Sequence, residues 1–126
     1  MTKKSSKNLL DSVETLIGQN AVIEGNLKTD KVIRIDGKIN GNIDAAGILL
    51  GADGLISGDI KTEVIMIGGA VKGNIFASES IEILPKAKVS GDIQTTLLTI
   101  AEGGFFEGKS SIINSEETNV AGAKKK

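Results

Sequence analysis

Aliphatic residues recur along most of the chain at fixed distances from a glycine. The repeated unit is a Gly-Asn or Gly-Asp step followed by an aliphatic residue. It occurs at Gly25-Asn26-Leu27, Gly41-Asn42-Ile43, Gly58-Asp59-Ile60, Gly73-Asn74-Ile75 and Gly91-Asp92-Ile93, with a degenerate sixth copy at Gly108-Lys109-Ser110. Successive glycines are 16, 17, 15, 18 and 17 residues apart. Self-similarity at so short a period predicts a repeat architecture.

Alignment of the six copies on this glycine produces four further columns of like residues. Two residues before the glycine stand Ile23, Ile39, Ile56, Val71, Val89 and Phe106. Eight before it stand Ile17, Ile33, Leu50, Ile65, Ile83 and Ile100, and two after it stand Leu27, Ile43, Ile60, Ile75, Ile93 and Ser110. Four before it every residue is small: Ala21, Gly37, Gly54, Gly69, Ala87 and Gly104. The apolar columns are predicted to face a common interior.

The spacing of these columns predicts strands. Apolar residues two before and two after the glycine alternate with period two, and most of them are Ile or Val. A unit of 15 to 18 residues is too short for a crossover helix, so each unit is expected to be one coil of a solenoid. Coils stacked about 4.8 Å apart place like residues over like and give a rod about 30 Å long. The predicted fold is an all-β, single-stranded parallel β-helix of about six windings over residues 15–112, with flexible tails at 1–14 and 113–126.

The composition excludes several classes of function. The 126 residues include no His, Cys, Trp or Tyr, which removes catalytic triads, thiolate nucleophiles, disulfides and zinc sites made of those ligands. With 15 Lys plus Arg against 16 Asp plus Glu and few aromatic residues, the chain is not expected to bind nucleic acid. No cofactor or metal is expected. The longest apolar run, Val64–Ile67, is far below the roughly 20 residues of a membrane span, and no secretory leader opens the sequence, so the expected location is cytoplasmic.

Three alternative functions require features that fit these patterns less well. A calcium-binding β-roll requires Gly-Gly-x-Gly-x-Asp, and neither Gly68-Gly69 nor Gly103-Gly104 is followed by Gly-x-Asp. The Asn and Asp of the repeat are therefore interpreted as bend residues that bond to local backbone. A glycosidase built on Asp36, Asp44, Asp53 or Glu82 would need long loops that the tight repeat does not contain. A hexapeptide-type β-helical acyltransferase would need a strict period of 18 and usually a histidine base.

The second unit carries the most specific motif of the chain. The sequence resembles the bactofilins, bacterial cytoskeletal proteins, through Leu16-Ile17-Gly18, the run from Ile23 to Leu27, and the run Ile35-Asp36-Gly37-Lys38-Ile39-Asn40-Gly41-Asn42-Ile43. The likeness extends over about residues 15–112. It implies a right-handed, roughly triangular β-helix that polymerises without nucleotide into non-polar filaments at the inner face of the membrane. It further implies a non-enzymatic scaffold for cell-shape machinery, such as cell-wall synthases or hydrolases.

The two ends of such a rod are the candidate interaction sites. A solenoid exposes unpaired strand edges and an apolar cross-section at each end unless something caps them. At the C-terminal end Phe105 and Phe106, two of the three aromatic residues, are candidate docking anchors. At the N-terminal end Ile17, Ile23 and Leu27 are the candidate contact. A non-polar filament requires like-to-like joints at both ends, whereas a rod with capped ends would be a monomeric partner-binding module.

The N-terminal tail is the candidate membrane contact. Lys3, Lys4 and Lys7 are followed by Leu9 and Leu10, and Leu9, Val13 and Leu16 are spaced for a weak amphipathic helix. Three lysines contribute about 3 kcal/mol at an anionic surface, which becomes effective when a polymer displays many tails. Bactofilin tails of this kind often carry a bulky apolar residue after Met1, whereas this chain has Thr2.

Overall fold

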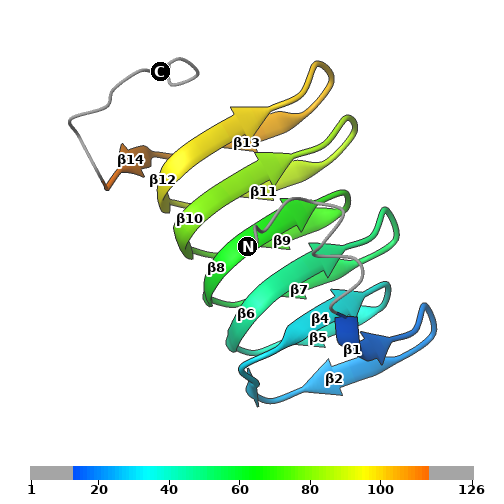
Figure 1. Ribbon diagram of the computed structural model, residues 1–126. Coiled ribbons are helices and arrows are strands. Elements are labelled where there is room, and N and C mark those ends of the chain that lie inside the picture. Colours follow the sequence, from blue (N-terminus) through cyan, green and yellow to red (C-terminus); the bar gives the residue numbers. More distant parts are fainter. Residues whose placement is uncertain (1–12, 114–126) are drawn as a thin grey trace.

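The chain folds into a rod of stacked β-strands with a strand-rich coil repeated along its axis (Figure 1). The structure is a computed structural model that describes residues 13–113. The strands are β1 (Val13–Ile17), β2 (Val22–Glu24), β3 (Leu27–Lys28), β4 (Val32–Ile35), β5 (Lys38–Asn40), β6 (Ile43–Leu50), β7 (Leu55–Ser57), β8 (Ile60–Ile67), β9 (Ala70–Lys72), β10 (Ile75–Ile83), β11 (Lys88–Ser90), β12 (Ile93–Ile100), β13 (Phe105–Glu107) and β14 (Ser110–Ile112). The predicted parallel β-solenoid of about six turns is confirmed.

Two parallel sheets run the length of the rod. One follows the order β1-β4-β6-β8-β10-β12-β14, with β3 also paired to β6, and the other follows β13-β11-β9-β7-β5-β2. Each long strand bends once and so provides two sides of its coil, and a short strand provides the third (Figure 1). In the third coil the first side is Ile43–Ala45, the second is Gly47–Leu50 and the third is Leu55–Ser57.

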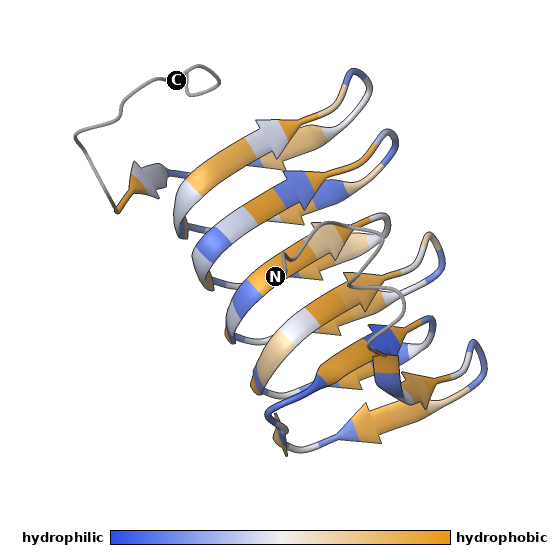
Figure 2. Cartoon of the chain, viewed as in Figure 1, coloured by the Kyte–Doolittle hydropathy of each residue, from blue (hydrophilic) through white to orange (hydrophobic). Residues whose placement is uncertain are grey.

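The interior of the rod consists of stacked aliphatic side chains. In the middle coils Ile48, Ile56, Ile65 and Ile81 are fully buried, with 0% exposure. Hydrophobic residues line the strands, and hydrophilic residues gather at the turns (Figure 2). The columns two before and two after the repeat glycine are confirmed, because the strand register stacks Ile39 on Ile56 and Ile43 on Ile60. Burial of these columns, at about 25 cal/mol per Å² of apolar surface, is the main stabilising contribution.

The prediction for the column eight residues before the glycine is wrong in two coils. The register runs Ile17, Ile35, Leu50, Ile67, Ile83 and Ile100, so Ile35 and Ile67 take the places predicted for Ile33 and Ile65. Ile33 and Ile65 lie in the neighbouring inward ladder. The predicted and observed positions differ by two residues. Because strand side chains two residues apart point in the same direction, both positions face inward and the alternation of apolar and polar residues is the same.

Two positions in the coil account for all the variation in its length. The turn between the second and third sides has four residues, as in Gly51–Gly54, but only two at Asp36–Gly37 and Gly68–Gly69. The corner between the first and second sides has one extra residue in the second and fifth coils, where the register shifts. These changes convert a 17-residue coil into coils of 16, 15 and 18 residues. From the second coil onward insertions are thus confined to corners, which leaves the inward ladders intact; in the first coil the register shifts within β1, between Val13 and Thr15.

A column of glycines allows the coils to approach at the corner between the third and first sides. Gly58 has a φ of +148°, a conformation that side chains disfavour. A Cβ on Gly58 would overlap the carbonyl oxygen of Gly41 in the coil below. Only glycine therefore permits the stacking distance at this corner.

The Asn and Asp side chains of the repeat connect successive coils. The Asp59 N–H donates to Asn42 Oδ1 at 3.0 Å, and the Asn74 N–H donates to Asp59 Oδ1 at 3.2 Å. The same kind of bond joins the remaining coils. The Asn42 N–H donates to Asn26 Oδ1, the Asp92 N–H donates to Asn74 Oδ1, and the Lys109 N–H donates to Asp92 Oδ1 at 3.3 Å. The expectation that these side chains bond to local backbone was wrong, because each acceptor serves a residue 15 to 18 positions later. We refer to this series as the amide relay.

The chain termini differ in part from the predicted tails. Val13 and Glu14, expected in the N-terminal tail, belong to β1. The helical interpretation of Leu9, Val13 and Leu16 is wrong for the last two, which lie in a strand, while Leu9 falls outside the described residues. Across residues 13–113 the structure contains no helix long and apolar enough to cross a membrane.

Candidate functional site: the two ends of the solenoid

The C-terminal end of the rod is only partly covered. β14 lies over the first side of the last coil, where Ser110 pairs with Ile93 and Ile112 with Thr95. Within the described residues no strand lies over the second and third sides. Ile100 is consequently 39% exposed, whereas Ile83, one coil below in the same column, is fully buried. The uncovered interior is an apolar surface that water contacts in the isolated chain.

The two phenylalanines of this end point in different directions. Phe106 stacks on Val89 and packs partly buried against the core, whereas Phe105 stacks on Lys88 in an outward column and is 52% exposed. Both lie on β13, the edge strand of its sheet. An edge strand offers unpaired N–H and C=O groups to a neighbouring chain. Phe105 and Phe106 therefore combine apolar surface with a free strand edge.

The N-terminal end also presents unpaired strand edges, but its inward column is less exposed. β1 and β2 are the edge strands of the two sheets, and β3 pairs only with β6 among the described strands. Of the predicted contact residues Ile23 and Leu27 are partly buried, and Ile17 is 7% exposed. Ile17 thus offers little surface to a neighbour. The predicted membrane contacts Lys3, Lys4, Lys7, Leu9 and Leu10 lie outside the described residues.

Several exposed apolar residues at the ends were absent from the sequence prediction. Leu16 and Val22 are each 63% exposed in the first coil, and Leu97 is 58% exposed in the last. Ile113, just after β14, is 41% exposed. The first three occupy outward columns, whereas the sequence prediction rests on the inward columns. Their signal is an aliphatic residue where the alternation calls for a polar one. The same columns hold Leu49, Leu55 and Met66 in the middle coils, so the sequence signal does not by itself identify the ends.

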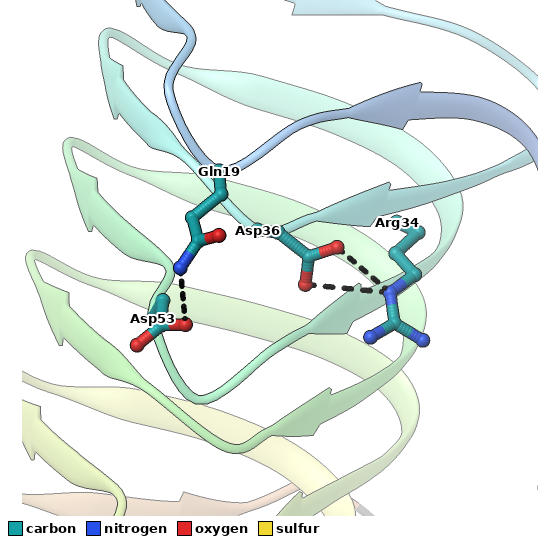
Figure 3. Close-up of polar contacts among 4 residues, drawn as sticks. All are labelled: Gln19, Arg34, Asp36 and Asp53. Carbon is teal, nitrogen blue, oxygen red and sulfur yellow. Dashed lines mark hydrogen bonds and ion pairs between the residues drawn. The ribbon is translucent and has the colours of Figure 1, made fainter.

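Polar side chains make two contacts with one another at the turns between the second and third sides. The Arg34 Nε donates to both carboxylate oxygens of Asp36 at 3.1 and 3.3 Å, and Gln19 Nε2 donates to Asp53 Oδ2 at 2.9 Å (Figure 3). The bond between Gln19 and Asp53 joins the four-residue turns of the first and third coils. It can form because the turn of the second coil, which lies between them, has only two residues. Residues 13–113 contain no group of three or more acidic side chains placed to hold a metal ion.

A shallow groove follows the outer surface of the first side. Lys28, Asp44, Lys61, Phe76 and Gln94 line it in one outward row, beside the amide relay. Acidic and basic residues alternate along its lower half. The Asp59 and Asp92 carboxylates that line it accept the Asn74 and Lys109 backbone N–H groups.

The repeat, the solenoid and the open ends agree with one known family. Its sequence profile, described as Bactofilin: Polymer-forming cytoskeletal, matches residues 15–111. The chain belongs to the bactofilin family. The resemblance deduced from the motifs is thereby confirmed.

Relatives and a solved structure support this assignment. Bactofilin BacO of Myxococcus xanthus (strain DK1622) is 35% identical over 95 residues, which cover 75% of each chain. Bactofilin BacP of the same organism is 27% identical over 96 residues, or 75% of this chain and 40% of BacP. The fold matches a cryo-EM reconstruction of Thermus thermophilus bactofilin double helical filaments with a TM-score of 0.66 at 20% identity, covering 79% of this chain and 98% of the other. At this identity the structural match supports the bactofilin fold alone.

Proposed function

We propose that this bactofilin assembles end to end into nucleotide-independent, non-polar filaments. The observation that carries the proposal is the difference between Ile100 and Ile83, which share one column but are 39% and 0% exposed. Stacking a second rod on the open end buries Ile100 and Phe106 in the same way that a further coil would. The contact uses side chains and strand edges of the chain itself and requires no bound nucleotide.

The amide relay favours like-to-like joints over head-to-tail stacking. In a head-to-tail filament the first coil of one rod would continue the columns of the rod below. The Asn26 N–H would then meet Lys109, whose side chain has no acceptor oxygen, instead of an Asn or Asp. The relay therefore ends at Lys109, and a joint between two C-terminal ends avoids the mismatch. Alternation with a joint between two N-terminal ends produces a filament without polarity.

Electron microscopy and cysteine cross-linking test both parts of this proposal. Negative-stain images of the full chain without nucleotide or metal should show filaments, and monodisperse rods would instead support a monomeric partner-binding module. Because the chain has no cysteine, single substitutions report on one position each. Glu24→Cys and Glu107→Cys occupy the two ends of one outward column, and Ser57→Cys lies at its middle.

The cross-linking result depends on polarity. With a bis-maleimide shorter than the rod, like-to-like joints should give covalent dimers of Glu24→Cys and of Glu107→Cys, but not of the Ser57→Cys control. In a head-to-tail filament neither end variant reacts with itself, because equivalent cysteines lie about 30 Å apart along the axis. An equal mixture of the two end variants would then be cross-linked efficiently. That outcome would overturn the non-polar arrangement while leaving polymerisation intact.

We further propose that the filament scaffolds envelope machinery at the inner face of the membrane. The support is the family assignment together with the lysine-rich start of the sequence. In a density gradient full-length filaments should float with phosphatidylglycerol vesicles, and the variant with Lys3, Lys4 and Lys7 changed to Glu should remain at the bottom. Equal flotation of both proteins would refute a role for these lysines. A fluorescent fusion that fails to coincide with sites of wall synthesis would refute the scaffold role.

A further inference from the structure

The N-terminal edge of β3 is a strand edge that no described residue covers. β3 pairs with β6 on one side, and within residues 13–113 no strand lies on its other side. The second and third sides of the first coil are formed by β1 and β2, so the first side is the one without a described strand. Leu27 is consequently only partly buried, whereas Ile43, one coil above in the same inward column, is 2% exposed.

The backbone at this edge offers bonds that the other coils use. One coil above, the Asn42 carbonyl accepts the Leu27 N–H at 2.9 Å, and the Asn42 N–H donates to Asn26 Oδ1 at 3.0 Å. Asn26 holds the same position in its own coil, so its N–H and C=O point away from β6. Among residues 13–113 neither group has a partner. The amide relay therefore starts with a donor that lacks its acceptor in the described part of the chain.

The sequence just before β1 repeats the pattern of a first side. Val13 and Gly47 lie in the same column. Asn8 stands five residues before Val13, and Asn42 stands five residues before Gly47. Asn8 is the only asparagine before β1, and an aliphatic residue follows it, as in every complete copy of the repeat. An acceptor and an inward side chain thus stand at the two positions that the edge of β3 leaves open.

We propose that residues 8–11 of the same chain bind the N-terminal edge of β3 as a parallel strand and complete the first coil. In this register Leu9 lies beneath Leu27 and faces inward. Asn8 Oδ1 accepts the Asn26 N–H, which extends the amide relay by one coil. The segment thereby removes apolar surface from water and pairs an open strand edge.

Two residues of the segment depart from the repeat, and the end position accounts for both. Lys7 stands where the repeat has glycine. At Gly41 a Cβ would overlap a carbonyl of the coil below, but no described residue lies below the first coil. Asp11 falls in the inward column of Thr29, which is partly exposed. Its carboxylate therefore keeps its contact with water and carries no burial cost.

The connection of the chain favours this segment over the other end of the sequence. β1 begins at Val13, so residues 8–11 reach the edge of β3 through a corner of the same length as the corner between Asn42 and Gly47. Residues 114–126 follow β14, whose first side is five coils from β3, or about 24 Å along the rod. The nearest chain that can supply the missing strand is therefore the one that enters β1.

The docked segment changes the role of two residues in the proposed function, and this consequence rests on that function. Leu27 is covered within its own chain and does not belong to the joint between N-terminal ends. Leu9 is part of the rod and does not contact lipid. Lys3 and Lys4 then remain as the membrane contact of the N-terminal tail.

Disulfide formation tests the register of the segment. Leu10 and Lys28 share one outward column in this register, about 4.8 Å apart, a distance that a disulfide spans. In the full chain Leu10→Cys with Lys28→Cys should form an intramolecular disulfide as fast as Asp44→Cys with Lys61→Cys, a stacked outward pair of the rod. Leu9→Cys with Lys28→Cys should react several times more slowly, because residue 9 points inward.

The pattern of cross-links decides between the possible occupants of the edge. Equal rates for Leu9→Cys and Leu10→Cys would show a segment without a fixed register and would overturn the proposal. Covalent dimers in place of intramolecular disulfides would assign the edge to a second copy of the chain and would overturn it as well. The bond forms within one chain, so the result is independent of filament assembly and of membrane binding.

Unfolding in urea, below the concentration at which filaments form, is the second test. Leu9→Ser should lower the midpoint because Leu27 loses its cover, whereas Leu10→Ser, at the outward position, should leave the midpoint unchanged. Asn8→Ala should lower it too, and Asn8→Asp should not, because Asp59 accepts the same bond higher in the rod. Equal midpoints for the two leucine variants would show that Leu9 covers nothing, which would overturn the proposal.

Discussion

The stability of the stacked interior can be tested by the same truncation at two places in one column. Ile83 and Ile100 occupy the same ladder but are 0% and 39% exposed. Conversion of isoleucine to alanine removes three carbons, worth about 2.4 kcal/mol when fully buried, at about 0.8 kcal/mol each. At Ile83 the cavity left between two coils raises the cost to about 3 to 5 kcal/mol.

The expected loss at the end of the rod is smaller. Because part of Ile100 already contacts water, about three fifths of the transfer free energy applies, and the open end leaves no closed cavity. Ile100→Ala should therefore lower the free energy of unfolding by about 1.5 kcal/mol in the unassembled chain. Since the sequence lacks Trp and Tyr, unfolding in urea is best followed by far-ultraviolet circular dichroism.

The comparison also reports on the proposed end joint. If a second rod covers Ile100, the truncation should weaken assembly more than it weakens folding, whereas Ile83→Ala should act on folding alone. Samples must be compared below the concentration at which filaments form, because assembly adds its own stabilisation. Equal losses of stability for the two variants would refute the reasoning, since they would show that the last coil is covered in the single chain.

Three further changes test other parts of the structure. Ile75→Asp should unfold the rod, because an unpaired charge would be buried between Ile60 and Ile93, and a folded variant by circular dichroism would contradict the inward assignment. Phe105→Arg should leave the fold intact and shorten filaments in electron micrographs, and unchanged filaments would remove Phe105 from the joint. Asn42→Ala should cost about 1 kcal/mol in urea unfolding by removing the acceptor of the Asp59 N–H, and an unchanged midpoint would make the relay dispensable.

The sequence by itself determined the repeat, the strand type and most of the interior. Alternation about the repeat glycine is sufficient to place Ile39 and Ile43 inside, because strand side chains change face with every residue. It was not sufficient to align all coils, since removing two residues from a turn keeps the alternation intact. The pairing of Ile35 with Leu50 therefore depended on the three-dimensional register.

Only the tertiary structure decided the contacts between successive coils. The acceptor role of Asn42 toward Asp59 joins residues 17 positions apart, and no local pattern distinguishes it from a bond within a turn. The exposure of Ile100 arises because no strand among residues 13–113 lies above the second side, and it does not depend on its own neighbours in sequence. These properties depend on residues that stack on one another in successive coils, and such residues come into contact only when the chain has folded.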